Sequence, residues 1–194
     1  MPLQEYRDRI ILILGKRGSG KTTLAKRIID EYDRIIIFDP LHEYEGEVVE
    51  SFEEFTELHL EDEESFRVVC RFNSLDLGDT LIQYDGVARA CYILENLLLV
   101  VEESQNFLSS GARYNAINNL ISMGRHTQVS IIGIARRPYE LSINLRGQVT
   151  TAISFVQTEP RDLAYLEDLD FDGEEVMNLG PHEFLQAGSE TLDL

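Results

Sequence analysis

A glycine-rich segment between an apolar run and a helical pattern constrains this chain more than any other feature. Residues 15–22 read Gly-Lys-Arg-Gly-Ser-Gly-Lys-Thr. The apolar run 10–14 precedes them, and residues 23–29 continue with the spacing of an amphipathic helix. The order is therefore strand, glycine-rich loop, helix, and the spacing G-x-x-x-x-G-K-[ST] is that of a P-loop.

The P-loop pattern predicts a site for the phosphates of ATP. Glycine lets the backbone adopt positive φ and approach an anion closely, and successive N–H groups then point into one concavity. The following helix adds the partial positive charge of its N-terminus. Lys21 is expected to reach the β- and γ-phosphates, and the Thr22 hydroxyl to bind Mg²⁺. The predicted nucleotide-binding residues are Gly15, Lys16, Arg17, Gly18, Ser19, Gly20, Lys21, Thr22 and Thr23.

A second apolar run ends in two carboxylates. Residues 97–101 are Leu-Leu-Leu-Val-Val, and Glu102 and Glu103 follow. An NTPase needs an acid for the Mg²⁺ shell and a base that positions the attacking water. We expect Glu102 to hold the metal through water and Glu103 to polarise the nucleophilic water. The alternative is that both acids only begin an exposed loop.

Apolar runs and helical patterns alternate along the whole chain. Strands are predicted at 10–14, 34–40, 66–72, 97–101, 129–135, 150–156 and 182–187, and residues 41–50 are predicted to form a loop. Helices are predicted at 21–30, 51–58, 79–95, 112–124, 140–145 and 159–169. This alternation favours a parallel α/β sheet. We expect a three-layer P-loop NTPase fold of RecA/ASCE-like type, with a mostly parallel central sheet flanked by helices. Residues 1–194 are expected to form a single P-loop ATPase domain.

Composition narrows the function classes. The chain has 35 acidic and 17 basic residues, a net charge of −18, which argues against non-specific coating of nucleic acid but leaves room for a local basic lining. No run of 18 or more apolar residues occurs, so no transmembrane helix is expected. Cys70 and Cys91 lie in apolar surroundings and without Cys/His motifs. They are predicted to be buried, reduced thiols and not zinc ligands.

Four stretches together carry a family resemblance. They are the P-loop at 15–22, Phe-Asp-Pro at 38–40, Val-Val-Glu-Glu-Ser-Gln-Asn at 100–106, and residues 124–138, which begin with Gly-Arg and end with Arg-Arg-Pro. With these motifs the chain resembles the HerA–FtsK superfamily of P-loop ATPases. Within that superfamily it looks most like the genome-packaging ATPases of double-jelly-roll viruses. The resemblance covers about residues 10–157.

The resemblance implies roles for three arginines. Arg125 matches the family's arginine finger, which reaches the nucleotide of the neighbouring subunit. Arg136 stands where many family members carry a sensor glutamine, and contact with the γ-phosphate is implied. Arg137 and Pro138 match the family's Arg-Pro pair. The alternatives are that Arg125 caps a helix end and that Arg136 and Arg137 are ordinary surface charges.

The resemblance also implies partners and location. It implies a homo-oligomeric ring that uses ATP and Mg²⁺ to move double-stranded DNA and docks on a capsid or portal vertex protein. The chain would act in the host cytoplasm or at the virion vertex. The loops expected to face DNA are the one around Arg113 and the stretch 137–146.

Two other function classes stay open. One is a nucleotide-dependent switch or assembly factor with little turnover, which the strong acidity favours. The other is a small-molecule kinase, which needs an arginine-rich lid and has no evident use for Glu102 and Glu103. A screen of phosphate acceptors separates the kinase from the ATPase.

Overall fold

An eight-stranded sheet forms the centre of the molecule. The computed structural model describes residues 8–73, 77–108, 116–123 and 126–194. The strands are β1 (Ile10–Leu14), β2 (Arg34–Phe38), β3 (Glu47–Val49), β4 (Phe66–Cys70), β5 (Leu97–Val101), β6 (Val129–Ala135), β7 (Thr151–Phe155) and β8 (Phe184–Gly188). Their order is β3-β4-β2-β5-β6-β1-β7-β8. Every neighbouring pair is parallel except β7 and β8, which are antiparallel.

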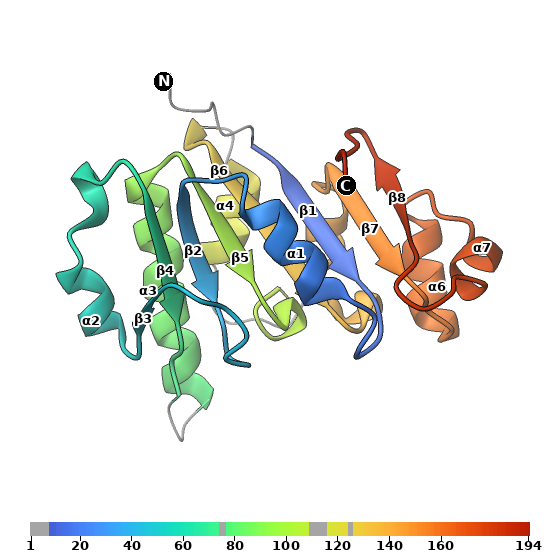
Figure 1. The fold of residues 1–194 in the computed structure, drawn as a ribbon, viewed down its shortest axis with the longest axis horizontal. Coiled ribbons are helices and arrows are strands. Elements are labelled where there is room, and N and C mark those ends of the chain that lie inside the picture. The colour runs from blue at the N-terminus through green and yellow to red at the C-terminus, as the bar shows by residue number, and fades with distance from the viewer. Residues whose placement is uncertain (1–7, 74–76, 109–115, 124–125) are drawn as a thin grey trace.

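Helices cover both faces of the sheet, but unequally. On one face α1 (Lys21–Ile29) packs Leu24, Ala25, Ile28 and Ile29 against the sheet. The opposite face is covered by α2 (Phe52–Glu57), α3 (Leu77–Leu94), α4 (Ala116–Met123), α5 (Ile143–Arg146), α6 (Pro160–Glu167) and α7 (Gly173–Met177). Figure 1 shows α1 in front of the sheet and α3 and α4 behind it. The strands β1, β2, β5, β6 and β7 are buried throughout, as expected for parallel strands covered on both faces.

The predicted fold class is confirmed, but short elements differ from the prediction. The helix predicted at 140–145 begins only at Ile143, as α5, because Leu141 is extended and the Ser142 side chain caps the helix. Residues 41–50 were predicted to form a loop, but Glu47–Val49 pair with β4 as the edge strand β3. Two of these three residues are exposed, so β3 leaves no apolar run in the sequence. The prediction also lacked α7, which has only five residues and begins where the Asp172 side chain accepts from the N–H groups of Glu174 and Glu175.

The sheet brings four loops together at one edge. Because β2, β5, β6 and β1 are consecutive parallel neighbours, their carboxyl ends lie at the same edge. The arrowheads of β1, β2 and β5 point to this edge, at the bottom of Figure 1. The P-loop follows β1, the Glu102–Glu103 pair follows β5, and Arg136 follows β6. Ligands of open α/β sheets bind at this edge.

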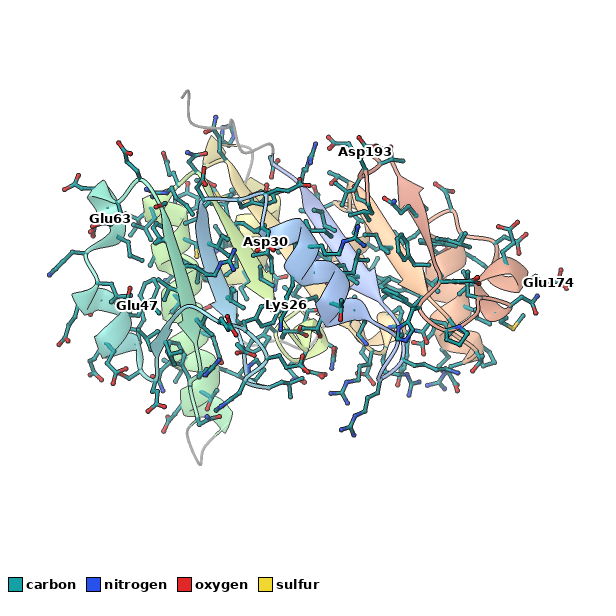
Figure 2. The ribbon with its side chains drawn as sticks, viewed as in Figure 1. Lys26, Asp30, Glu47, Glu63, Glu174 and Asp193 are labelled. Atoms are coloured by element: carbon teal, nitrogen blue, oxygen red, sulfur yellow. The ribbon has the colours of Figure 1, made fainter. Side chains whose placement is uncertain are left out.

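Acidic side chains are spread over both ends of the molecule. Figure 2 shows Glu47 and Glu63 at the β3 end and Glu174 on α7 at the other end, whereas Lys26 projects from α1 between them.

The two cysteines are free and buried. Within the described ranges, no helix has both the length and the apolar character needed to cross a bilayer.

Candidate nucleotide-binding and hydrolysis site

The P-loop connects β1 to α1 in a conformation that depends on glycine. Gly15 is buried, and a Cβ built on it would lie 2.7 Å from Cβ of Phe155 on β7. Gly20 caps α1 with φ of 107°, in the left-handed region. The backbone can therefore turn tightly out of β1 and open the N-terminus of α1 toward the loop.

Two polar groups of the P-loop are available to an anion. The Ser19 hydroxyl oxygen is buried and has no hydrogen-bond partner among the described residues. The Lys21 ammonium donates to the Lys16 carbonyl oxygen at 2.8 Å, so it folds back over the loop. Burial lowers the pKa of Lys21, and the charge of Glu102 opposes this shift. A buried cation and an unpaired hydroxyl in a glycine-rich loop fit a phosphate group.

The other predicted P-loop residues lie around this concavity. Lys16, Arg17 and Gly18 are exposed at the tip of the loop, and the Lys16 ammonium donates to the Thr158 hydroxyl. Thr23 is exposed on the first turn of α1. Their part in nucleotide binding stays a prediction.

The carboxylate of Glu102 lies against Thr22. Its Oε1 atom accepts from the Tyr44 hydroxyl at 2.8 Å and is 3.2 Å from Oγ1 of Thr22. Only 3% of Glu102 is exposed, which disagrees with the alternative that this acid begins an exposed loop. Burial raises the pKa of Glu102, and the hydrogen bond from Tyr44 opposes that shift.

Glu103 is held by two neighbouring side chains. Its Oε1 atom accepts from the Arg136 guanidinium and its Oε2 atom from the Gln105 amide. Its backbone has φ of 47°, which is uncommon for a residue other than glycine and often marks functional sites. The structure thus brings together Glu103 and Arg136, which are far apart in the sequence.

Seven of the predicted site residues of these loops line one cleft. It has a volume of about 260 Å³. Its lining residues are Arg17, Gly18, Lys21, Thr22, Leu41, Glu43, Glu102, Glu103 and Arg136. The cleft therefore combines a phosphate-binding loop, two carboxylates after β5 and cationic side chains from two loops.

A second cleft adjoins the first and shares Arg17 and Arg136 with it. Its volume is about 290 Å³, and Lys16 and Arg137 also line it. Arg137 donates to the Asp162 carboxylate at 3.0 Å, so α6 holds this side chain in place. Four cationic side chains thus line this second cleft beside two carboxylates, Glu159 and Asp162, in a chain with a net charge of −18.

Sequence reasoning missed Glu43, which contacts Thr22, and Tyr44, which contacts Glu102. Both lie after β2, in a segment whose many glutamates gave no reason to single one out. Burial, followed by the charge of Glu102, raises the pKa of Tyr44, so the phenol stays protonated and donates to Glu102. The Phe-Asp-Pro motif at 38–40 was the available clue, because Asp39 binds this segment.

Oxygen donors for a magnesium ion meet at Thr22. Glu43 Oε2 is 2.9 Å and Glu102 Oε1 is 3.2 Å from the Thr22 hydroxyl oxygen. Among the described residues no three His, Cys, Asp or Glu side chains form a ready-made metal cluster. Hydroxyl and carboxylate oxygens still fit Mg²⁺, which binds one or two carboxylates together with substrate phosphates and water.

Two predicted arginines lie outside the described residues. Arg125, the predicted arginine finger, belongs to the range 124–125, and Arg113, from a predicted DNA-facing loop, belongs to 109–115. Their roles stay predictions.

Solved structures share this fold across nearly the whole chain. The genome packaging NTPase B204 of Sulfolobus turreted icosahedral virus 2, in complex with AMPPCP, matches with a TM-score of 0.72 and 20% identity, over 95% of this chain and 93% of that chain. B204 of Sulfolobus turreted icosahedral virus, described as a DNA-packaging ATPase, gives 0.67 and 18%, over 93% and 92%. VirB4 of Thermoanaerobacter pseudethanolicus gives 0.62 and 14%, over 94% and 89%. The predicted resemblance is thus confirmed at the level of the fold.

The sequence itself matches a family. No curated protein matches the chain, but the family described as AAA domain matches residues 4–140, which is more than half of its length. This range contains the P-loop, both carboxylates after β5 and Arg136. The chain therefore belongs to the AAA domain family and is a P-loop NTPase.

Proposed function

We propose that the chain is an ATP-hydrolysing motor that drives double-stranded DNA into a viral capsid. The observation that carries the proposal is the single cleft in which Lys21 and Thr22 of the P-loop face Glu102 and Glu103. Phosphate binding, a metal-holding acid and a base for water are the parts that ATP hydrolysis requires.

Five residues of the cleft have roles in the proposed reaction. The Lys21 ammonium leaves its hydrogen bond to the Lys16 carbonyl oxygen and binds the phosphates instead. The N–H groups of the P-loop bind the phosphate oxygens. Thr22 and Glu102 would hold Mg²⁺, which would supply positive charge to neutralise the developing phosphate charge. Glu103 releases the Arg136 guanidinium and accepts a proton from the attacking water. Arg136, once released, is free to stabilise the γ-phosphate.

The proposed motor works as a homo-oligomeric ring. An arginine finger such as Arg125 acts on a neighbour's nucleotide, so a site is complete only between two subunits. The fold shared with B204 supports double-stranded DNA and a capsid or portal vertex protein as partners, in the host cytoplasm or at the virion vertex. The cationic side chains Lys16, Arg17 and Arg137 of the second cleft support contact with a polyanion.

A nucleotide-dependent switch with little turnover is the second candidate. It is favoured by one observation, the engagement of both Glu103 oxygens by Arg136 and Gln105. A base held in this way polarises no water until a rearrangement frees it.

ATP hydrolysis with and without long double-stranded DNA tests the proposal. We expect DNA to stimulate turnover in the wild type, and Glu103→Gln to abolish turnover while ATP still binds. Glu61→Gln, an equal charge change in the remote 3₁₀ helix Leu60–Asp62, is the matched control and keeps full turnover. Turnover that DNA leaves unchanged contradicts the motor, and ATP binding without turnover favours the switch.

A further inference from the structure

The segment after β2 is built to enter the cleft. We call residues 39–46 the clasp loop. Asp39, at its start, is fully buried. Its Oδ1 atom accepts from the backbone N–H of Glu43 at 2.9 Å, and its Oδ2 atom accepts from the backbone N–H of Tyr44 at 3.1 Å. One buried carboxylate thus fixes the backbone of both residues that face the site.

Strand β4 holds the clasp loop from the other side. The Arg71 guanidinium, just after β4, donates to Asp39 Oδ2 at 3.1 Å and to the Tyr44 carbonyl oxygen at 2.5 Å. Gly46 closes the loop so near the sheet that a Cβ there would lie 2.6 Å from the Arg67 carbonyl oxygen. The Lys26 ammonium of α1 lies 5.3 Å from the centre of the Tyr44 ring. The position of the loop is therefore determined by several independent contacts.

Two carboxylates converge on one hydroxyl. Glu43 Oε2 is 2.9 Å and Glu102 Oε1 is 3.2 Å from Oγ1 of Thr22. A hydroxyl has a single proton and donates it to one acceptor at a time. When both carboxylates are ionised, one carboxylate oxygen therefore faces the Thr22 oxygen without a proton between them. A cation bound by all three oxygens removes this conflict.

A hydrogen bond from Tyr44 orients the Glu102 carboxylate. The Tyr44 hydroxyl donates to the same Oε1 atom of Glu102 that approaches Thr22. This hydrogen bond fixes the carboxylate toward the Thr22 hydroxyl, as residues behind a metal ligand commonly do. The clasp loop thus offers one carboxylate to the cation position and orients another.

We propose that Glu43 is a second carboxylate of the Mg²⁺ shell and that Tyr44 is the positioning residue for Glu102. The inference deepens the proposed function and rests on it, because the cation enters with the nucleotide. In this arrangement the cation is held from two strands, by the clasp loop after β2 and by Glu102 after β5. Direct and water-mediated binding by Glu43 both satisfy the proposal.

Cation affinity, and not turnover, tests this inference. Mn²⁺ serves as the probe, and its binding is followed by electron paramagnetic resonance with the full chain and a non-hydrolysable ATP analogue. We expect Glu43→Gln to weaken Mn²⁺ binding by about 10-fold or more, the loss typical of a lost shell residue, and Glu43→Asp to restore part of it. Affinity for the analogue in EDTA is expected to be equal to that of the wild type or higher, since a negative charge near the phosphates is lost.

Glu45→Gln is the matched control, because Glu45 is an exposed glutamate of the same loop. It is expected to bind Mn²⁺ like the wild type. Equal Mn²⁺ affinity in Glu43→Gln and Glu45→Gln overturns the inference and leaves the proposed function intact. A wild type that binds no nucleotide overturns the proposed function itself.

Tyr44→Phe tests the positioning role. It keeps the ring that Lys26 approaches and removes only the donor to Glu102. We expect weaker Mn²⁺ binding, with a smaller loss than in Glu43→Gln. A Tyr44→Phe variant with a lower melting temperature and wild-type Mn²⁺ affinity shows a structural role only and overturns this part of the proposal.

Discussion

Gly15 illustrates how one missing side chain determines the shape of the P-loop. A Cβ at this position would lie 2.7 Å from Cβ of Phe155 and 2.8 Å from the Ser19 hydroxyl oxygen. We expect Gly15→Ala to lower the free energy of unfolding by about 1–3 kcal/mol, the usual cost of overpacking, and to weaken nucleotide binding. Gly147→Ala is the control, since its Cβ would have no neighbour closer than 3.9 Å. Urea denaturation measures both, and equal stability in the two variants contradicts the steric account.

The Arg136 side chain has a contact in the structure, with Glu103, and a predicted contact, with the γ-phosphate of ATP. It pairs with Glu103 in this structure and is predicted to contact the γ-phosphate during turnover. Removing one such donor typically lowers kcat about 10²–10³-fold, so Arg136→Ala is expected to lose at least this much at saturating ATP.

Arg136→Gln separates the two roles of this arginine. Glutamine still donates to a phosphate oxygen but carries no charge for an ion pair with Glu103, so we expect it to retain more turnover than Arg136→Ala. Steady-state kinetics of both variants provides the measurement. If Arg136→Ala and the wild type have equal kcat, Arg136 takes no part in catalysis.

At the scale of elements, the clasp loop depends on one buried ion pair. Asp39 is fully buried and pairs with Arg71. We expect Asp39→Ala to cost about 3–5 kcal/mol of stability, because a buried charge loses its partner. Asp30→Ala removes the ion-pair partner of Arg67. Because the Asp30 side chain is 70% exposed, this change is expected to cost at most about 1 kcal/mol. Thermal and urea unfolding measure the stability of both variants. A loss of stability in Asp39→Ala as small as that in Asp30→Ala contradicts the view that the Asp39–Arg71 pair holds the clasp loop.

The elements that could be predicted from the sequence are those with a strong pattern. β1, β5 and β6 are unbroken apolar runs, and α1 and α3 have helical spacing over many residues. β3 escaped prediction because an exposed edge strand buries little and needs no apolar run. The antiparallel direction of β8 could not be predicted either, because it depends on which strand β8 pairs with. The hydropathy pattern gives the position of a strand but not its neighbour.

The site could be predicted where a local motif defines it. Lys21, Thr22, Glu102 and Glu103 follow from spacing and from acids after an apolar run. Glu43 could not be selected, because its approach to Thr22, which follows β1, depends on the strand order β2-β5-β6-β1. The order of the strands along the chain does not tell which strands are neighbours in the sheet.

At the scale of the whole molecule, the distribution of charge affects assembly. The chain carries −18, and acidic side chains occupy both ends in Figure 2. Subunits that meet through these ends repel one another at low salt. Raising ionic strength from 0.1 to 1 M shortens the Debye length from about 10 Å to about 3 Å. We therefore expect salt to promote assembly of the proposed ring, measured by analytical ultracentrifugation, and dissociation by salt contradicts a repulsion-limited ring.

We propose that ATP hydrolysis in this cleft moves the protein along DNA. Displacement of a triplex-forming oligonucleotide from long double-stranded DNA tests it most directly. We predict displacement with ATP and Mg²⁺ in the wild type, and none with the non-hydrolysable analogue or with Glu103→Gln. DNA-stimulated hydrolysis that displaces no oligonucleotide, at any position of the triplex along the DNA, contradicts the claim that this ATPase is a motor.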